Sequence, residues 1–107
     1  VMNIETPRVT GNTDEKISRA AIVTGSGSEY IDIAVSNGAQ FFITGDLKYH
    51  YALELKEKGL NVLDAGHFDT EKVFPQAMSR FIRRSITELG YIDIIESGAD
   101  VNPFEYR

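Results

Sequence analysis

Apolar and polar positions follow one another along this chain in a repeated strand and helix order. Three short apolar runs have the length of buried strands, at residues 18–23, 39–44 and 60–64. The segments between them have helical periodicity and end at Gly38 and Gly59, since glycine commonly terminates a helix. Strands joined through helices by short connections predict right-handed crossovers. We therefore expect the α/β class, with a mainly parallel mixed sheet and helices on both faces.

The elements at the two ends of the chain are predicted from shorter patterns. Residues 1–9 fit an edge strand and residues 91–96 a last strand. The first helix is expected to be capped by Ser28. The clearest helical stripe is made by eight apolar residues: Val73, Phe74, Ala77, Met78, Phe81, Ile82, Ile86 and Leu89. We expect this stripe, Phe81 included, to share one core with the strands.

Pro75 interrupts the start of that third helix, because proline inside a helix removes a hydrogen bond. Two alternatives follow. The helix begins near Thr70 and is kinked at Pro75, or regular helix begins only at Pro75. We favour the first alternative, because it places His67 and Glu71 on a single turn.

Composition sets the class of protein more broadly. The 107 residues fit one domain, 1–107, and 42% hydrophobic with 25% charged residues is ordinary for a globular protein. The formal net charge of −5 argues against a nucleic-acid or anionic-membrane partner. There is no cysteine, so disulfides and thiolate zinc sites are excluded. No apolar run has the roughly 18–20 residues of a membrane span, and no signal pattern opens the chain. We expect a cytoplasmic protein.

The two histidines of the chain follow two of the predicted strands, which is where open α/β sheets place their chemistry. His67 and Glu71 are four residues apart, so one helical turn would point both side chains to the same side. An imidazole and a carboxylate suit Zn²⁺, Mn²⁺ or Fe²⁺. The alternative is an exposed histidine beside a glutamate that complements the helix dipole, because this spacing alone is a weak motif.

Asp46, Lys48 and His50 form a second candidate group after the strand at 39–44. Asp46 and His50 are also four apart, so they are candidates for proton transfer or for support of a ligand, and Lys48 for contact with an anionic substrate. The alternative for Asp46 is the N-cap of the following helix, a common position for aspartate.

The segment Thr24–Ser28 is glycine-rich and lies between a predicted strand and helix. Such a turn can present backbone N–H groups to an anion. It lacks the third glycine of the dinucleotide fingerprint and the Gly-Lys-Ser of a P-loop. Ser26 does not fit a nucleophile elbow either, because Thr24 and Ser28 replace the required glycines. A tight turn without a ligand explains the segment equally well.

Several separated motifs occur in one order: AAIVTGSGSEYI, ITGDLKYHYALE, GLNVLDAGHFDTEK and a closing NPF. Together they resemble the carboxy-terminal part of the NIF-three family, whose members are often named GTP cyclohydrolase type-two homologues. The resemblance extends from about Arg8 to Phe104. It implies a two-lobed α/β protein that forms a toroidal hexamer and holds two divalent metal ions (Zn, Mn or Fe) between its lobes. In this scheme His67 and Glu71 are metal ligands.

One departure limits what this chain is expected to do alone. The family's opening lobe carries a paired-histidine motif and an H-T-N-x-D stretch that complete the two-metal site, and the sequence contains neither. We therefore expect one lobe of a longer protein. Two protein ligands are too few for a typical catalytic site, so the chain alone should bind metal weakly.

The sequence leaves three functions open. The first is the metal-binding lobe of a metal-dependent hydrolase that acts on a small nucleotide-like or phosphorylated substrate, with Asp46, Lys48 and His50 lining the pocket. The second is a metal-loaded scaffold or interaction module without turnover. The third is an α/β domain whose glycine-rich loop binds an anion.

Overall fold

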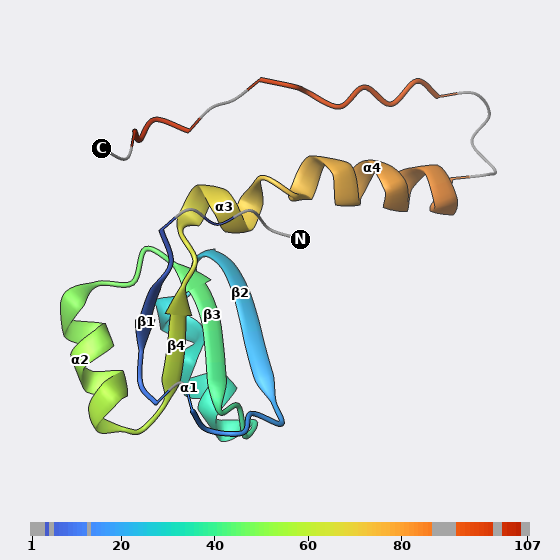
Figure 1. Cartoon of the computed structure of the whole chain (residues 1–107). Coiled ribbons are helices and arrows are strands. Elements are labelled where there is room, and N and C mark those ends of the chain that lie inside the picture. Colours follow the sequence, from blue (N-terminus) through green and yellow to red (C-terminus); the bar gives the residue numbers. More distant parts are fainter. Residues whose placement is uncertain (1–3, 5, 13, 87–91, 100–101, 106–107) are drawn as a thin grey trace. The chain divides into compact units, whose positions relative to one another are not determined.

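The computed structural model describes residues 4, 6–12, 14–86, 92–99 and 102–105. These residues fall into two compact units, Val1–Glu71 and Lys72–Arg107. The first unit holds a four-stranded sheet and the second holds one long helix (Figure 1). No helix within the described ranges is long and apolar enough to cross a membrane.

The sheet of the first unit has the strand order β1-β4-β3-β2. Its strands are β1 (Arg8–Thr10), β2 (Ala20–Ser26), β3 (Phe41–Gly45) and β4 (Asn61–Asp64). β2, β3 and β4 run parallel, and β1 pairs with β4 in the antiparallel direction. This arrangement confirms the expected α/β class and the mainly parallel sheet, with a short antiparallel strand at its edge.

The helices of the first unit follow the predicted order with different starting points. They are the 3-10 helix η1 (Ser28–Tyr30), α1 (Ile31–Ser36), α2 (Tyr49–Glu57) and α3 (His67–Glu71). Gly38 and Gly59 have φ of 78° and 72°, a conformation that glycine adopts without strain, so both positions end their helices as predicted. The prediction that Ser28 caps the first helix is wrong. Neither η1 nor α1 has a side-chain cap, and the Ser28 hydroxyl is buried without a hydrogen-bond partner.

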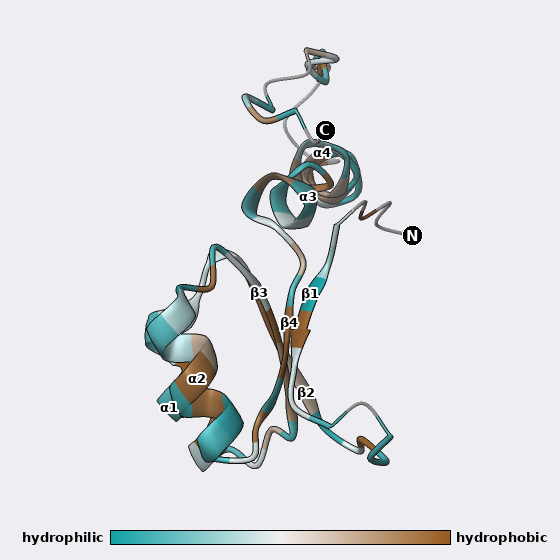
Figure 2. Cartoon of the chain, turned by 60° about the vertical axis from the view of Figure 1, so that its left-hand side comes forward, coloured by the Kyte–Doolittle hydropathy of each residue, from teal (hydrophilic) through white to brown (hydrophobic). Residues whose placement is uncertain are grey.

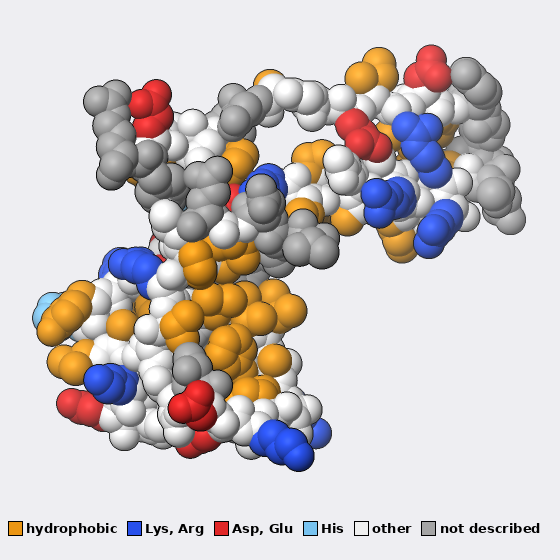
Figure 3. All heavy atoms as spheres, viewed as in Figure 1, with side chains coloured by type: hydrophobic (Ala, Val, Ile, Leu, Met, Phe, Trp, Pro, Cys, Tyr) orange, Lys and Arg blue, Asp and Glu red, His pale blue; other side chains and the backbone are white. Residues whose placement is uncertain are grey.

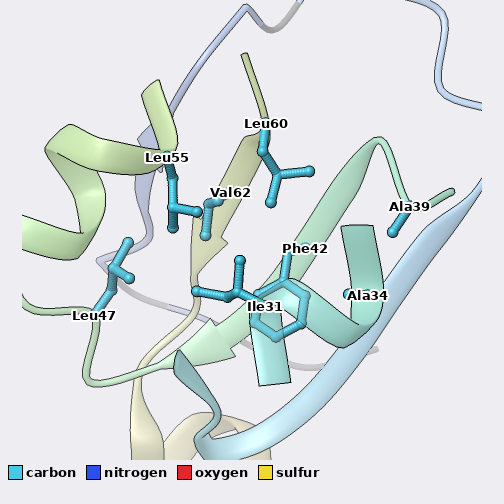
Figure 4. Close-up of a cluster of buried hydrophobic side chains, with 8 residues drawn as sticks. All are labelled: Ile31, Ala34, Ala39, Phe42, Leu47, Leu55, Leu60 and Val62. Carbon is cyan, nitrogen blue, oxygen red and sulfur yellow. The ribbon is translucent and has the colours of Figure 1, made fainter. Parts of the chain in front are cut away.

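The core lies between the sheet and the two helices α1 and α2. Phe42 of β3 and Val62 of β4 are neighbours in register and are both 0% exposed, because each faces the helices from the centre of the sheet. The cluster around them is drawn in Figure 4 and consists of Ile31, Ala34, Ala39, Phe42, Leu47, Leu55, Leu60 and Val62. α1 and α2 therefore pack on the same face of the sheet (Figure 2), whereas the sequence predicted helices on both faces.

The opposite face of the sheet is apolar and partly open to solvent. Val9, Leu63, Ile43 and Ile22 lie side by side in register across all strands. Val9 is 50% and Ile22 is 59% exposed. Figure 3 shows hydrophobic side chains gathered over the sheet on this side. The alternating pattern of the strands thus gives two apolar faces, of which the described helices α1 and α2 cover one.

The second unit is built around α4 (Phe74–Ser85). α3 ends at Glu71 and α4 begins at Phe74, so the helix is broken between them and not kinked. The break suits Pro75, which lies in the first turn of α4, where a missing N–H costs no helical hydrogen bond. The favoured alternative was right in keeping His67 and Glu71 on one turn, but the helix that contains them begins at His67.

One prediction about this second unit is wrong and another stays a prediction. Phe81 on α4 is 64% exposed, and the sharing of one core by the α4 stripe and the strands stays a prediction. Residues 92–96 form no strand, while Leu89 and Tyr91 lie outside the described residues. Polar groups of α4 bind this segment instead. The Ser79 hydroxyl donates to the Glu96 carboxylate, and the Arg83 guanidinium donates to the Ile94 carbonyl at 2.7 Å.

Candidate metal-ligand site

Three loops meet where the parallel strands of the sheet end. Gly25 lies near the end of β2, Asp46 directly follows β3, and His67 begins α3 shortly after β4. The carboxyl ends of adjacent parallel strands lie at one edge of a sheet, and this edge is where α/β proteins bind ligands. The fold therefore gathers the sequence-predicted residues Asp46 and His67 at one place.

The His67 ring is held at both nitrogens by carboxylates. Its Nδ1 lies 2.6 Å from Oδ2 of Asp46, and its Nε2 lies 3.2 Å from Oε2 of Glu71. Both predicted ligands belong to the single turn α3, so the four-residue spacing does place them together. The pairing of Asp46 differs from the prediction, because its carboxylate binds His67 and not His50.

These contacts change the protonation of His67. The hydrogen bond that the His67 ring donates to the Asp46 carboxylate is the main cause that raises the pKa of His67 above its usual value of 6.5. The negative charge of Glu71 raises the pKa further, while partial burial of the ring lowers it. The ring is still about half exposed, so solvent screens both carboxylates. His67 therefore keeps its proton to a higher pH than an isolated histidine in the absence of metal.

An uncommon backbone conformation aims the Asp46 side chain. Asp46 has φ of 52°, which is left-handed and rare for a residue with a Cβ, although aspartate tolerates it better than most. The alternative role of Asp46 as an N-cap is not observed, since Lys48 is the N-cap residue of α2 and that helix has no side-chain cap. The strained turn directs the carboxylate across to His67.

Gly25 leaves the space that Glu71 and His67 occupy. A Cβ at Gly25 would lie 2.5 Å from Oε1 of Glu71 and 3.2 Å from Nε2 of His67. The backbone around it is fixed by Thr70, whose hydroxyl accepts from the Gly25 N–H at 2.9 Å and donates to the His67 carbonyl at 2.8 Å. The end of β2 thus supports α3 directly.

The glycine-rich loop is already bonded to the protein. Gly27 N–H donates to the Thr44 hydroxyl at 2.8 Å, just as Gly25 N–H donates to Thr70. Both threonines are buried. The Gly25 and Gly27 amides are therefore already used as donors within the protein, and anion binding by the loop stays an alternative.

Lys48 and His50 are exposed residues near the start of α2. The His50 ring contacts the Tyr49 ring edge-on, with their centroids 5.5 Å apart. Neither side chain is in the hydrogen-bonded group around His67. Their contact with a substrate therefore stays a prediction.

The His67 and Glu71 side chains fit a divalent ion in chemistry and spacing. Two ligands of a tetrahedral ion with bonds of about 2.0–2.2 Å lie about 3.3–3.6 Å apart, close to the 3.2 Å between Nε2 and Oε2. Metal-ligating histidines usually donate their other ring N–H to a carboxylate, which is the position of Asp46. Among the described residues there is no group of three or more potential ligands arranged to hold an ion, so further ligands would have to come from elsewhere.

Sequence reasoning missed the partner of Asp46 and the supporting role of Thr70. A signal for the first was present, because Asp46 and His67 follow strands that pair side by side. Helical spacing instead favoured His50, which is nearer in the chain. No sequence signal marks Thr70 as the acceptor for Gly25, since that contact joins residues 45 positions apart.

The fold is that of an α/β lobe with a mainly parallel sheet, and comparisons define its family. The model of the DUF34/NIF3 (NGG1p interacting factor 3) family matches residues 1–103, and the chain belongs to this family. A curated relative, the GTP cyclohydrolase 1 type 2 homolog of Staphylococcus aureus (strain MSSA476), is 39% identical over 106 residues, covering 98% of this chain. The chain spans only 29% of that relative's length.

Solved structures agree with the family. The crystal structure of Staphylococcus aureus protein SA1388 is similar with a TM-score of 0.81 and 34% identity, covering 99% of this chain and 30% of the other. The Bacillus cereus protein related to NIF3 has a TM-score of 0.73 and 27% identity, with 99% and 29% covered. Both comparisons confirm the resemblance to a lobe of a NIF3 protein.

Proposed function

We propose that this chain is the lobe of a NIF3-family protein that supplies His67 and Glu71 to a divalent metal site, one of two ions in the intact protein. The observation that carries the proposal is the His67 ring, bound by Asp46 at Nδ1 and facing Glu71 with Nε2. Bonding at Nδ1 fixes the tautomer and leaves the Nε2 lone pair directed toward Glu71.

The described residues would have different roles in such a site. A divalent ion at this place would supply Lewis acidity and activate water. Glu71 adds negative charge beside Nε2, and Asp46 orients the ring and balances a positive charge on it. Gly25 leaves room for the Glu71 side chain, because the Cβ of any larger residue would come too close to the Glu71 carboxylate.

For the intact protein we propose a metal-dependent hydrolase acting on a small nucleotide-like or phosphorylated substrate. The relatives named GTP cyclohydrolase 1 type 2 homolog support a ring-opening or related hydrolytic reaction. Lys48 and His50 are the proposed substrate contacts or proton carriers, since both are exposed near the same loop as Asp46. We also propose a cytoplasmic protein that self-associates as a hexamer.

A second candidate is a metal-loaded scaffold without turnover. The family description, NGG1p interacting factor 3, names an interaction and favours this alternative. The two functions share the metal site and differ in whether water is activated against a substrate.

Metal analysis of the intact protein tests the shared part of the proposal. The protein is purified without chelator, loaded with Mn²⁺ or Zn²⁺, desalted and measured by elemental analysis. His67→Ala should remove most of the bound metal, because a ligand is lost. His50→Ala is the matched control and should retain it. Equal metal contents in the wild type and in His67→Ala would refute the ligand assignment.

Turnover then separates the two functions. The metal-loaded protein is screened against nucleotides, phosphoesters and GTP ring opening. Metal-dependent activity that disappears in Glu71→Gln supports the hydrolase. A fully loaded wild-type protein that turns over none of these compounds favours the scaffold.

A further inference from the structure

Asp64 is a buried carboxylate that the proposed chemistry does not use. It is the last residue of β4 and is 4% exposed. A buried charge requires hydrogen-bond donors, because removal from water is otherwise costly. Its carboxylate accepts hydrogen bonds from one guanidinium and from two backbone amides. The positions of the two amides indicate the role of Asp64.

The two amides belong to the two loops that carry Asp46 and His67. Oδ2 of Asp64 accepts from the N–H of Leu47 at 3.1 Å, and Leu47 directly follows Asp46. Oδ1 accepts from the N–H of Gly66 at 3.1 Å, and Gly66 directly precedes His67. The Asp64 carboxylate thus binds the backbone next to Asp46 and the backbone next to His67, the two residues that form the hydrogen bond at Nδ1.

The loop of Asp46 needs such support, because its backbone is in the left-handed region. Asp46 has φ of 52°, whereas the φ of 81° at Gly66 is one that glycine adopts without strain. A residue with a Cβ persists in this region only when its surroundings fix it. Arg8 of the edge strand adds a further brace, donating to the Asp64 carboxylate and, at 3.1 Å, to the Leu47 carbonyl.

We infer that Asp64 is a positioning residue, which sets the ring orientation and tautomer of His67 by tying the loops of Asp46 and His67 to each other. Asparagine at this position would keep one oxygen and replace the other by an NH₂ group, which cannot accept. Either the Leu47 or the Gly66 amide would then lose its partner. The Asp46 carboxylate would no longer be held against Nδ1.

Nitrogen NMR of the two histidine rings tests this inference. The ¹⁵N-labelled 107-residue chain is measured with a chelator at a pH raised until the His67 ¹⁵N shifts stop changing, so that these shifts show which ring nitrogen carries the proton. In the wild type, His67 should carry its proton on Nδ1. In Asp64→Asn the His67 proton should be shared between Nδ1 and Nε2, as in the tautomer mixture expected for His50. Asp46→Asn should give the same change.

Asp32→Asn is the matched control, because it removes one negative charge from an exposed side chain of the same unit. It should leave the His67 pattern unchanged. A folded Asp64→Asn variant, with wild-type circular dichroism and His50 signals, that keeps the wild-type His67 tautomer would overturn the inference. A loss of the Nδ1 proton only in the Asp64 and Asp46 variants supports it.

Amide exchange in the wild type decides the matter if Asp64→Asn does not fold. The Leu47 and Gly66 amides should exchange at least about tenfold more slowly than in an unfolded chain, because a buried carboxylate accepts from them. Exchange at the unfolded-chain rate would overturn the inference. The importance of this positioning rests on the proposed function, but neither measurement needs metal. The tautomer result therefore stands or fails independently of the metal-retention result.

Discussion

Replacing Phe42 by alanine should remove much of the stability of the first unit. Phe42 is 0% exposed and lies at the centre of the core cluster, between β3 and the helices. A buried Phe→Ala substitution costs about 3–5 kcal/mol, through lost burial and the cavity left behind. A small domain has about 5–15 kcal/mol in total, so this loss is a large fraction.

Urea unfolding followed by circular dichroism measures the effect, with Phe81→Ala as the matched control. With a slope of about 1–3 kcal/mol per molar urea, Phe42→Ala should lower the midpoint by at least about 1 M. Phe81 is 64% exposed, so the same substitution there should cost about 1 kcal/mol or less. If Phe42→Ala is unfolded from the start, Val62→Ala gives a smaller test, with a transfer loss of about 1.6 kcal/mol plus a cavity term.

Equal losses for Phe42→Ala and Phe81→Ala would refute this description of the core. Such a result would mean that the apolar stripe of α4 is as deeply buried in the folded chain as the centre of the sheet. A small loss for Phe42→Ala alone would mean that α1 and α2 do not pack on β3 as described.

Further predictions concern the site. Gly25→Ala and Gly59→Ala should each cost about 1–2 kcal/mol in urea unfolding, since both have positive φ. Only the Gly25 variant should also displace Glu71 from His67 in a crystal structure, because nothing lies within 4 Å of a Cβ at Gly59. Thr70→Val should cost about 1–3 kcal/mol by leaving the buried Gly25 N–H without an acceptor, and an unchanged midpoint would contradict that bond. The raised pKa of His67 should stabilise the metal-free chain fully below about pH 6.5, with the contribution lost as pH rises through the raised pKa, and Asp46→Asn should abolish this dependence.

The parts of the fold that the sequence predicted depend on local patterns. The apolar runs that became β2, β3 and β4 and the terminating glycines Gly38 and Gly59 are readable because strand length and left-handed termini are local properties. The four-residue spacing of His67 and Glu71 is local in the same sense. Each of these predictions needed only a few consecutive residues.

The partner of Asp46 was not predictable in this way. Asp46 and His67 are 21 residues apart, and they meet because β3 and β4 are adjacent and because Asp46 adopts φ of 52°. Helical spacing predicted a contact between Asp46 and His50, because they are four residues apart. It gives no information on contacts that depend on which strands are adjacent in the sheet. The same holds for Thr70 and Gly25, which join the end of β2 to α3.

The stripe on α4 shows a different limit of sequence reasoning. Phe74 is 59% and Phe81 is 64% exposed, although the spacing of apolar residues predicted a helix with one buried face. Periodicity establishes that a helix has an apolar side, but it does not identify the surface that covers this side. In a chain that spans 29% of its relative's length, that surface need not be encoded in the same sequence. An exposed apolar stripe is therefore compatible with a correct helix prediction, and the surface that covers the stripe of α4 stays a prediction.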